Sequence, residues 1–336
     1  MGSALYVGDV HATVDGIEDC RRLIEFVKKV ADEHHPDRIV FLGDQYHNHG
    51  IMHVEVMAFW KWAFNRLRGH PIVALRGNHD APGDESSTSH ALMAHLNEVD
   101  FIVDKPMVLD GIMHLPYYHS ADEFVAVCKA ASEKVVVCHQ SFNGGRYDNG
   151  IFMEGGVEPN LIPQELVISG HVHSPQEFSK VWYMGAPRWR TLSDANIDRS
   201  IWLVEHNDDG TIASKEAFDT SDACQRIVSG IETPEDILDV PSNPNWRYMI
   251  DIKGPVDFVN ERKAYWKKTL PGVRIRTFPQ TKKVKKAVRE SEGLEKSFGA
   301  YMKVYTPPNG TSKDVLHTLV KERLGVAISV EAASAA

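Results

Sequence analysis

The sequence has few cysteines and lacks long apolar runs, and both absences restrict the kind of protein that it can form. Its four cysteines are scattered, with no Cys-x-x-Cys pair: Cys20, Cys128, Cys138 and Cys224. This spacing argues against a disulfide framework or a zinc ribbon and favours reduced thiols in a cytosol-like compartment. No apolar run is long enough to span a bilayer, and no cationic leader precedes an apolar core. We therefore expect a soluble protein of the cytoplasm or nucleoid, neither secreted nor bound to a membrane.

Acidic residues are missing from one stretch, residues 262–289. Its eleven charged side chains are all basic, although the whole chain has a formal net charge of −9: Arg262, Lys263, Lys267, Lys268, Arg274, Arg276, Lys282, Lys283, Lys285, Lys286 and Arg289. Such segregation predicts a polyanionic partner for this region alone. The alternative is a solvated surface, but a solubilising surface normally mixes both signs.

Apolar residues are abundant and periodic. They make up 43% of the 336 residues, which is enough for a sizeable core and excludes global disorder. Short apolar runs alternate with stretches of helical spacing, such as residues 17–32 and 57–67. This alternation is typical of parallel strands joined by helices, so the fold class predicted for the main domain is α/β.

Five of the strand-like runs end in residues that can bind metal ions. The runs are Leu5–Val7, Ile39–Leu42, Ile72–Leu75, Val135–Cys138 and Leu166–Ser169. The residues that follow them are Asp9 and His11, Asp44, Asn78 to Asp80, His139, and His171 with His173. Because open α/β sheets bind ligands at the carboxyl ends of their strands, we expect one site along that edge.

Carboxylate, amide and imidazole groups together suit Mn²⁺, Fe²⁺ or Zn²⁺. A shared Asp can bridge two ions about 4 Å apart, as two-metal hydrolases require. Each motif taken alone has an ordinary structural interpretation, since Gly-Asp is a common turn and a single Asp-x-His is usually a surface feature. The coincidence of all five at strand ends makes a metal site the better interpretation.

These motifs, in this order, resemble the signature of the calcineurin-like metallophosphoesterases over roughly Leu5–Glu205. The resemblance implies an α/β (α+β) sandwich of two sheets flanked by helices, holding two divalent ions. Mn²⁺ is the first choice, and Mg²⁺, Fe²⁺ or Zn²⁺ would also suit. The ligand set that it implies is Asp9, His11 and His173 for the first ion, Asn78, His139 and His171 for the second, and Asp44 as the bridge.

The same resemblance gives roles to further residues. It implies that His79 contacts the scissile phosphate and assists the leaving group, with Asp80 orienting the imidazole. The sequence from Gly43 to His47, Gly-Asp-Gln-Tyr-His, is similar to that of SbcD-type nucleases of double-strand-break repair, in which a histidine here contacts substrate phosphate. By this resemblance His47 joins the catalytic set. A solvated cluster of His47, His49 and His53 is the alternative.

The tail of the chain is expected to hold two further units. We predict a nuclease domain over residues 1–232 and a small basic β-α-β domain over residues 245–305, where SbcD-type enzymes carry their DNA-capping domain. The predicted DNA-binding residues are Arg262, Lys263, Lys267, Lys268, Arg274, Arg276, Lys282 and Lys283. Residues 306–336 should form a linker and a C-terminal helix with an apolar stripe, which could dock on a partner or pack on its own domain.

The resulting hypothesis is a two-metal phosphodiesterase that cleaves DNA as an exonuclease or endonuclease. The resemblance implies a homodimer joined to a coiled-coil ABC-type ATPase of the SbcC kind, in a recombination and repair complex. One alternative is a stand-alone phosphodiesterase for a small substrate such as a cyclic nucleotide, which would not need the basic stretch. A non-catalytic scaffold is the other alternative, but such scaffolds typically lose ligands, and none is missing here.

Overall fold

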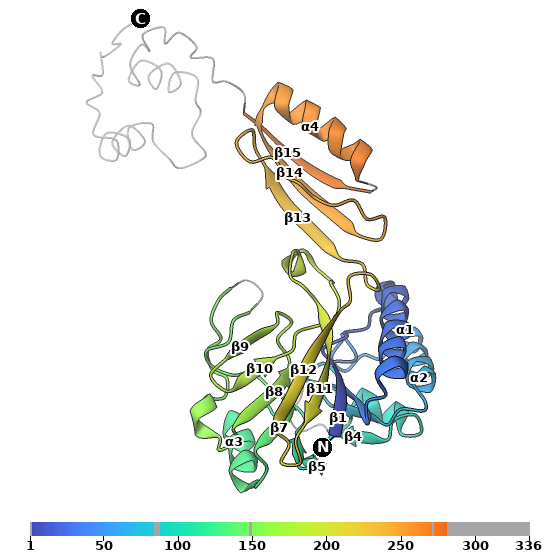
Figure 1. The fold of residues 1–336 in the computed structure, drawn as a ribbon, viewed down its shortest axis with the longest axis vertical. Helices are drawn as coiled ribbons and strands as arrows, with labels where there is room; N and C mark the ends of the chain where they lie inside the picture. Colours follow the sequence, from blue (N-terminus) through green and yellow to red (C-terminus); the bar gives the residue numbers. More distant parts are fainter. Residues whose placement is uncertain (1, 84–87, 148–149, 271, 281–336) are drawn as a thin grey trace, which may run out of the picture. The chain divides into compact units, whose positions relative to one another are not determined.

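The computed structural model describes residues 2–83, 88–147, 150–270 and 272–280, and within them the main architecture is a sandwich of two six-stranded sheets (Figure 1). The first sheet has the order β12-β11-β1-β2-β3-β4. Its strands are β1 (Gly2–Val7), β2 (Arg38–Phe41), β3 (Ile72–Leu75), β4 (Phe101–Val103), β11 (Ser200–His206) and β12 (Ile212–Asp219). Strands β1 to β4 are parallel, whereas β11 and β12 are antiparallel additions at one side.

The second sheet has the order β5-β6-β7-β8-β10-β9. Its strands are β5 (Met107–Leu109), β6 (Ile112–His114), β7 (Val135–His139), β8 (Leu166–Gly170), β9 (Gln176–Phe178) and β10 (Val181–Tyr183). The four central strands, β6, β7, β8 and β10, are parallel. This arrangement confirms the predicted α/β sandwich of two sheets.

Alternation along the strands divides the apolar side chains into three core layers, because successive residues point to opposite faces of a sheet. In β2, Ile39 and Phe41 pack under the helices, while Val40 points between the sheets. In β7, Val137 points between the sheets and Val136 packs on the outer side. The layer between the sheets fixes how closely their carboxyl edges approach one another.

Helices cover the two outer faces. Helices α1 (Ile17–His34) and α2 (Val54–Arg66) pack on the first sheet, and α3 (Ala121–Ala130) packs on the second (Figure 1). Helix α3 is capped by Ser120, whose side chain accepts the backbone N–H of Glu123. Short 3₁₀ helices occur at Val14–Gly16, Ala91–His95, Pro159–Leu161 and Leu192–Asp194.

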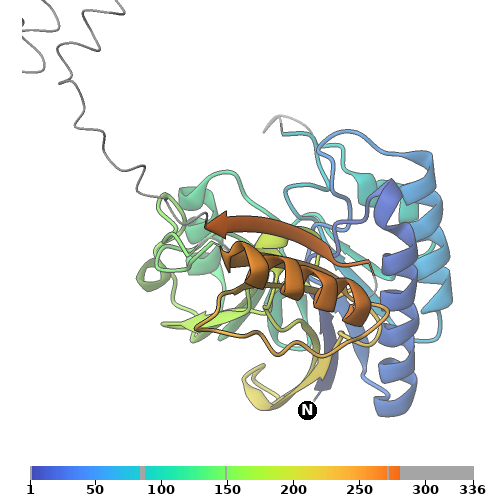
Figure 2. The same cartoon turned by 90° about the horizontal axis from the view of Figure 1, so that it is seen from above.

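A three-stranded sheet follows the sandwich, in the order β13-β14-β15. Strands β14 (Arg247–Pro255) and β15 (Arg274–Gln280), together with α4 (Val256–Thr269), are the predicted β-α-β unit. Helix α4 packs along one face of this sheet through Val259 and Trp266 (Figure 2).

The small sheet begins earlier in the chain than the predicted small domain. Strand β13 (Ile227–Glu232) runs parallel to β14, so the small sheet begins at Ile227 rather than at residue 245. Pro234, Pro241 and Pro244 lie in the crossover that joins β13 to β14. The predicted C-terminal linker and helix, residues 306–336, lie outside the described residues. None of the described helices is long and apolar enough to cross a membrane.

Candidate metal centre

The sandwich brings all five predicted strand ends together, although they belong to two sheets rather than one. Strands β1, β2 and β3 supply three of them from the first sheet, and β7 and β8 supply two from the second. Three of the side chains lie on residues with a left-handed backbone: φ is 46° at His11, 52° at Asp44 and 82° at His171. Such conformations are rare outside glycine and cluster at functional sites, where the surrounding structure imposes them.

Two glycines make room for these turns. Gly43 has φ 109°, and a Cβ there would lie 2.3 Å from the His139 ring. A Cβ on Gly77 would lie 2.2 Å from Asp44 Oδ1. Both distances are far below van der Waals contact, so a side chain at either position would displace a predicted metal ligand.

Asp44 lies at the centre of the cluster. Its Oδ1 accepts the backbone N–H of His79 at 2.8 Å. Its Oδ2 lies 3.3 Å from His11 Nε2 and 3.3 Å from His139 Nε2. One carboxylate oxygen therefore faces imidazoles from both predicted ligand groups, which is the position that a bridging ligand requires.

The second predicted ligand group is compact. Asn78 Oδ1 lies 3.0 Å from His139 Nε2 and 3.0 Å from His171 Nδ1. The opposite nitrogen of His139 lies 2.8 Å from the Leu42 carbonyl, to which it donates when it carries the proton. This bond leaves Nε2 turned toward the cluster with its lone pair available, the usual orientation of a metal-binding histidine.

The first predicted group comprises Asp9, His11 and His173. The Nε2 atoms of His11 and His173 are 3.0 Å apart. Asp9 is fully buried, and neither of its carboxylate oxygens makes a hydrogen bond of normal geometry within the described residues. Its ion-pair partner among the described residues is His139, whose Nδ1 lies 3.6 Å from Oδ1. A buried carboxylate without hydrogen bonds is costly, so this donor set fits a bound cation.

The electrostatics of the centre favour a cation. Burial raises the pKa of Asp9 to about 7. At Asp44 burial acts in the same direction, but His139 and His11 overcome it and hold its pKa low. Burial would lower the pKa of His139, yet Asp44 and Asp9 raise it to about 9. The carboxylates thus attract positive charge into the centre, and a divalent ion would supply it.

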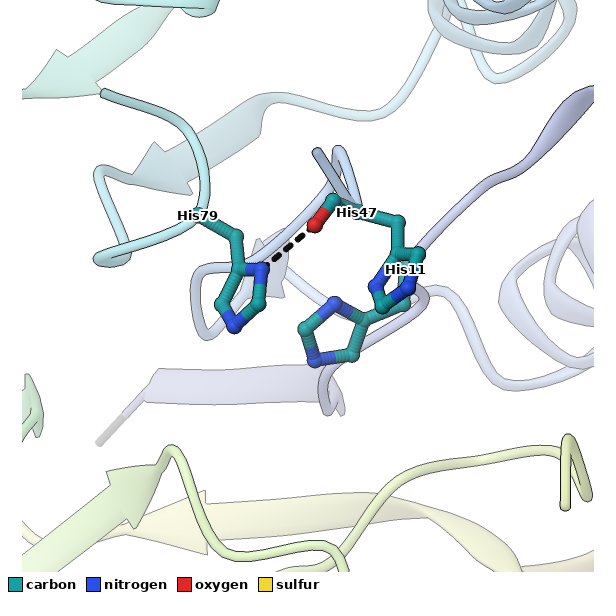
Figure 3. A group of neighbouring side chains, drawn as sticks. All are labelled: His11, His47 and His79. Carbon is teal, nitrogen blue, oxygen red and sulfur yellow. Dashed lines mark hydrogen bonds between the residues drawn. The ribbon is translucent and has the colours of Figure 1, made fainter. Parts of the chain in front are cut away.

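His79 and Asp80 are both at the centre, but Asp80 does not orient the imidazole as predicted. The Asp80 carboxylate is buried and accepts the backbone N–H groups of Tyr46 and Gly77 at 2.9 Å each. The His79 ring is instead held by the backbone carbonyl of His47, 2.5 Å from Nδ1 (Figure 3). The sequence could not indicate this, because a carbonyl acceptor has no residue signature.

His47 lies beside the predicted ligands. Its ring stacks on His79 with centroids 5.6 Å apart and meets His11 edge-on at 5.4 Å (Figure 3). Burial and the nearby Arg190 lower its pKa to about 4, so the imidazole is neutral at physiological pH. His11, His47 and His79 form one close group of candidate ligands, and Asp44, His139 and His171 form another. Sequence reasoning missed Arg190, whose Nη2 lies 3.0 Å from His47 Nε2.

Two of the predicted DNA-binding residues have carboxylate partners. Arg262 binds Glu232 at 2.6 Å, and Arg276 binds Asp251 at 2.7 Å. Both acids lie before the basic stretch in the sequence. The absence of acidic residues within the stretch therefore did not mean that its basic side chains are unpaired. In the part of the chain that the structure describes, no ion pair is formed by Lys263, Lys267, Lys268 or Arg274. Lys282 and Lys283 lie outside the described residues.

Comparison with known proteins identifies the family. The family model for calcineurin-like phosphoesterases matches residues 3–175, a little over half of the chain. The fold and the site define a phosphoesterase that uses bound metal ions. The chain belongs to the calcineurin-like phosphoesterase family and is a metal-dependent hydrolase.

Exonuclease subunit 1 of Enterobacteria phage T4 is 30% identical over 146 residues, which cover 40% of this chain and 42% of that protein. The chain thus matches less than half the length of this relative. Among solved structures, Yfce, a phosphoesterase from E. coli, aligns at 14% identity and TM-score 0.31 over 64% of this chain and 98% of its own. A 5′-nucleotidase precursor from Thermus thermophilus aligns at 12% identity and TM-score 0.36, over 65% and 54% respectively.

The position of His79 predicts that its replacement slows turnover without loss of bound metal. Replacing it with Ala should slow phosphodiester hydrolysis by roughly 10²–10⁴-fold, the usual contribution of a general acid. Bound metal should persist, because the predicted ligands remain. Steady-state kinetics on bis(4-nitrophenyl) phosphate and metal analysis of the same preparation would measure both quantities. His34→Ala, at the far end of α1, is a matched control. Near-normal turnover of the His79 variant would remove His79 from the catalytic set.

Proposed function

We propose that the protein is a nuclease that hydrolyses DNA phosphodiester bonds with two divalent ions, Mn²⁺ being the first choice. The exonuclease name of the phage T4 relative supports a nucleic-acid substrate, although that match covers only part of both proteins. The mixed set of carboxylate, amide and imidazole donors suits Mn²⁺ and equally Fe²⁺ or Zn²⁺. Bound ions would supply Lewis-acid stabilisation of the charge that develops on the phosphate.

The observation that carries this proposal is a cationic hollow that includes Arg190, the residue in contact with His47 at the rim of the metal centre. It has a volume of about 380 Å³, and its lining includes Arg190, Arg247 and Arg274. Arg190 lies on the loop that follows β10, whereas Arg247 and Arg274 begin strands β14 and β15 of the small sheet. In the described chain none of the three is ion-paired. A row of cations leading from a phosphoesterase centre fits a substrate with successive phosphates better than a single cyclic nucleotide.

The residues of the centre have distinct roles in this proposal. Asp9, His11 and His173 would hold one ion, and Asn78, His139 and His171 the other, with Asp44 shared. His79, whose Nδ1 bonds to the His47 carbonyl, would contact the scissile phosphate through its free ring edge and assist departure of the leaving oxygen. His47 itself is neutral and lies at the rim of the centre, where it can donate a hydrogen bond to a substrate phosphate.

The proposal predicts Mn²⁺-dependent cleavage of linear DNA. Labelled duplex and single-stranded DNA should be degraded in Mn²⁺ and spared in chelator, as followed by gel electrophoresis. Asp44→Asn should abolish cleavage, because both ions lose a shared anionic ligand, and the exposed Asp122→Asn serves as its matched control. Hydrolysis of a cyclic nucleotide without any cleavage of DNA would favour the small-substrate alternative.

The unpaired cations of the small sheet and α4 predict a salt-dependent DNA affinity. Replacing Lys267 and Arg274 together with Gln should reduce the slope of log affinity against log salt by about two, since each phosphate contact contributes about −0.9. Arg276→Gln is the control, because that guanidinium is already bonded to Asp251 and should change the slope less. An unchanged slope in the double variant would contradict a DNA-binding role for this unit.

We also propose the partners that the resemblance implies, a second copy of the chain and a coiled-coil ABC-type ATPase. The predicted docking segment carries Val315, Leu316, Leu319, Val320 and Leu324 at helical spacing. A chain that ends at Thr306 should therefore fail to co-purify with the ATPase subunit, whereas the full chain should retain it. Equal recovery of the ATPase by both chains would exclude this segment as the docking site.

A further inference from the structure

Arg190 belongs to a loop that is tied to the metal centre and held rigidly. Its neighbour Arg188 donates to the carbonyls of Val10 and His11 at 2.7 and 2.6 Å. These carbonyls are in the segment that carries the predicted ligands Asp9 and His11. Movement of the loop would therefore break these bonds or displace that segment, so the backbone beside Arg190 is anchored to the centre.

A buried carboxylate completes this anchoring. Asp194 Oδ2 accepts the backbone N–H groups of Arg190 and Thr191 at 2.9 and 2.7 Å. Its Oδ1 accepts Arg199 Nη2 at 2.6 Å, and both side chains are buried. All these bonds use the backbone of Arg190 or other side chains. The guanidinium of Arg190 is consequently not needed to hold its own loop.

That guanidinium is directed at the rim of the centre. Its Nη2 lies 3.1 Å from Nδ1 and 3.0 Å from Nε2 of His47, whose ring packs against His11 and His79. No carboxylate of the described chain lies within ion-pairing distance of Arg190. Burial and the neighbouring Arg188 lower its pKa, as expected for a cation without an anionic partner. An arginine has five N–H donors, so several remain for an incoming anion.

The space in front of Arg190 is polar and open to ligand. A hollow of about 340 Å³ is lined by His47, Arg188, Arg190, Thr191 and Arg247. Two carboxylates also line it, Asp15 and Asp19, and Asp19 lies 3.7 Å from the Arg188 guanidinium. Arg190 and Arg247 also line the neighbouring hollow described above. Arg190 thus stands between the metal centre and the cations of the small sheet.

We propose that Arg190 binds the phosphate adjacent to the scissile one and thereby selects substrates with at least two successive phosphates. The planar fork of a guanidinium matches the oxygens of a phosphodiester and binds them with charge-assisted hydrogen bonds. The Arg190 guanidinium contacts His47 on the side of the metal centre. It also lines the hollow that contains Arg247 and Arg274, so it links the metal centre to these cations. This inference rests on the proposed action on nucleic acid, and it names a residue that sets the preference.

Removal of one charge from the substrate tests this role directly. In short single-stranded oligonucleotides, the linkage next to the one whose cleavage is measured would be replaced by a neutral methylphosphonate. One oligonucleotide would carry the replacement on the 5′ side of the measured linkage and another on its 3′ side. For the wild-type protein, neutralisation on one of the two sides should lower kcat/KM by about 10- to 100-fold, the worth of a hydrogen bond between charged groups. Neutralisation on the other side should have a smaller effect.

Arg190→Gln should show a comparable loss on the fully charged oligonucleotide and no further loss on the methylphosphonate. Arg190→Lys should recover part of the activity, because it restores the charge without the fork. Arg68→Gln, an exposed arginine beyond the end of α2, is the matched control and should behave as wild type. Thermal unfolding of each variant checks that the loop is intact.

Different results would contradict the role of Arg190 and the proposed nuclease function. If Arg190→Gln stayed as sensitive to the methylphosphonate as the wild-type protein, Arg190 would not contact that phosphate and the inference would be overturned. If the wild-type protein did not cleave any oligonucleotide, the proposed nuclease function would fall first. A loss on bis(4-nitrophenyl) phosphate as large as that on DNA would also overturn the inference, because that substrate has no second phosphate.

Discussion

The structure depends on placing one carboxylate, that of Asp44, between the carboxyl edges of two sheets. Its Oδ1 is held by the backbone of His79, and its Oδ2 faces His11 and His139. A charge in this buried position is unfavourable unless positive groups surround it. The protein supplies imidazoles from both sheets, and the raised pKa of His139 shows how strongly the carboxylates attract positive charge. Two divalent ions would satisfy the same demand more completely.

The rest of the sandwich can be understood as the means of holding that arrangement. The Asp44 turn needs a left-handed backbone, a glycine before it and a glycine at residue 77, because no Cβ fits at either position. The distance between the two edges is set by the apolar layer between the sheets, where Val40 and Val137 point inward from facing strands. A change in this layer would therefore alter the separation of ligands that lie on different sheets. Stability and metal geometry are coupled through packing.

The candidate ligands could be picked out from the sequence, and the structure brings them together, because their positions obey local rules. Each lies just beyond a short apolar run, and parallel strands bring such ends to one edge. The interactions that the sequence did not reveal are long-range or involve the backbone. The Arg262–Glu232 and Arg276–Asp251 pairs join residues 30 and 25 positions apart. The carbonyl that holds His79, and the pairing of β13 with β14, likewise follow from tertiary structure and have no residue motif.

The neutral His47 lies next to the metal site and the charged Arg190 lies beyond it, and this order has a chemical consequence. His47, at the rim, is neutral because burial and Arg190 disfavour its protonation. A protonated imidazole there would repel bound metal ions and could no longer accept a hydrogen bond from Arg190. The guanidinium, which stays charged at any physiological pH, stands one step further out. Under the proposed function, an approaching phosphate chain would thus meet permanent positive charge on the outside and the neutral imidazole of His47 at the rim, so attraction of the substrate does not require a charged imidazole beside the metal ligands.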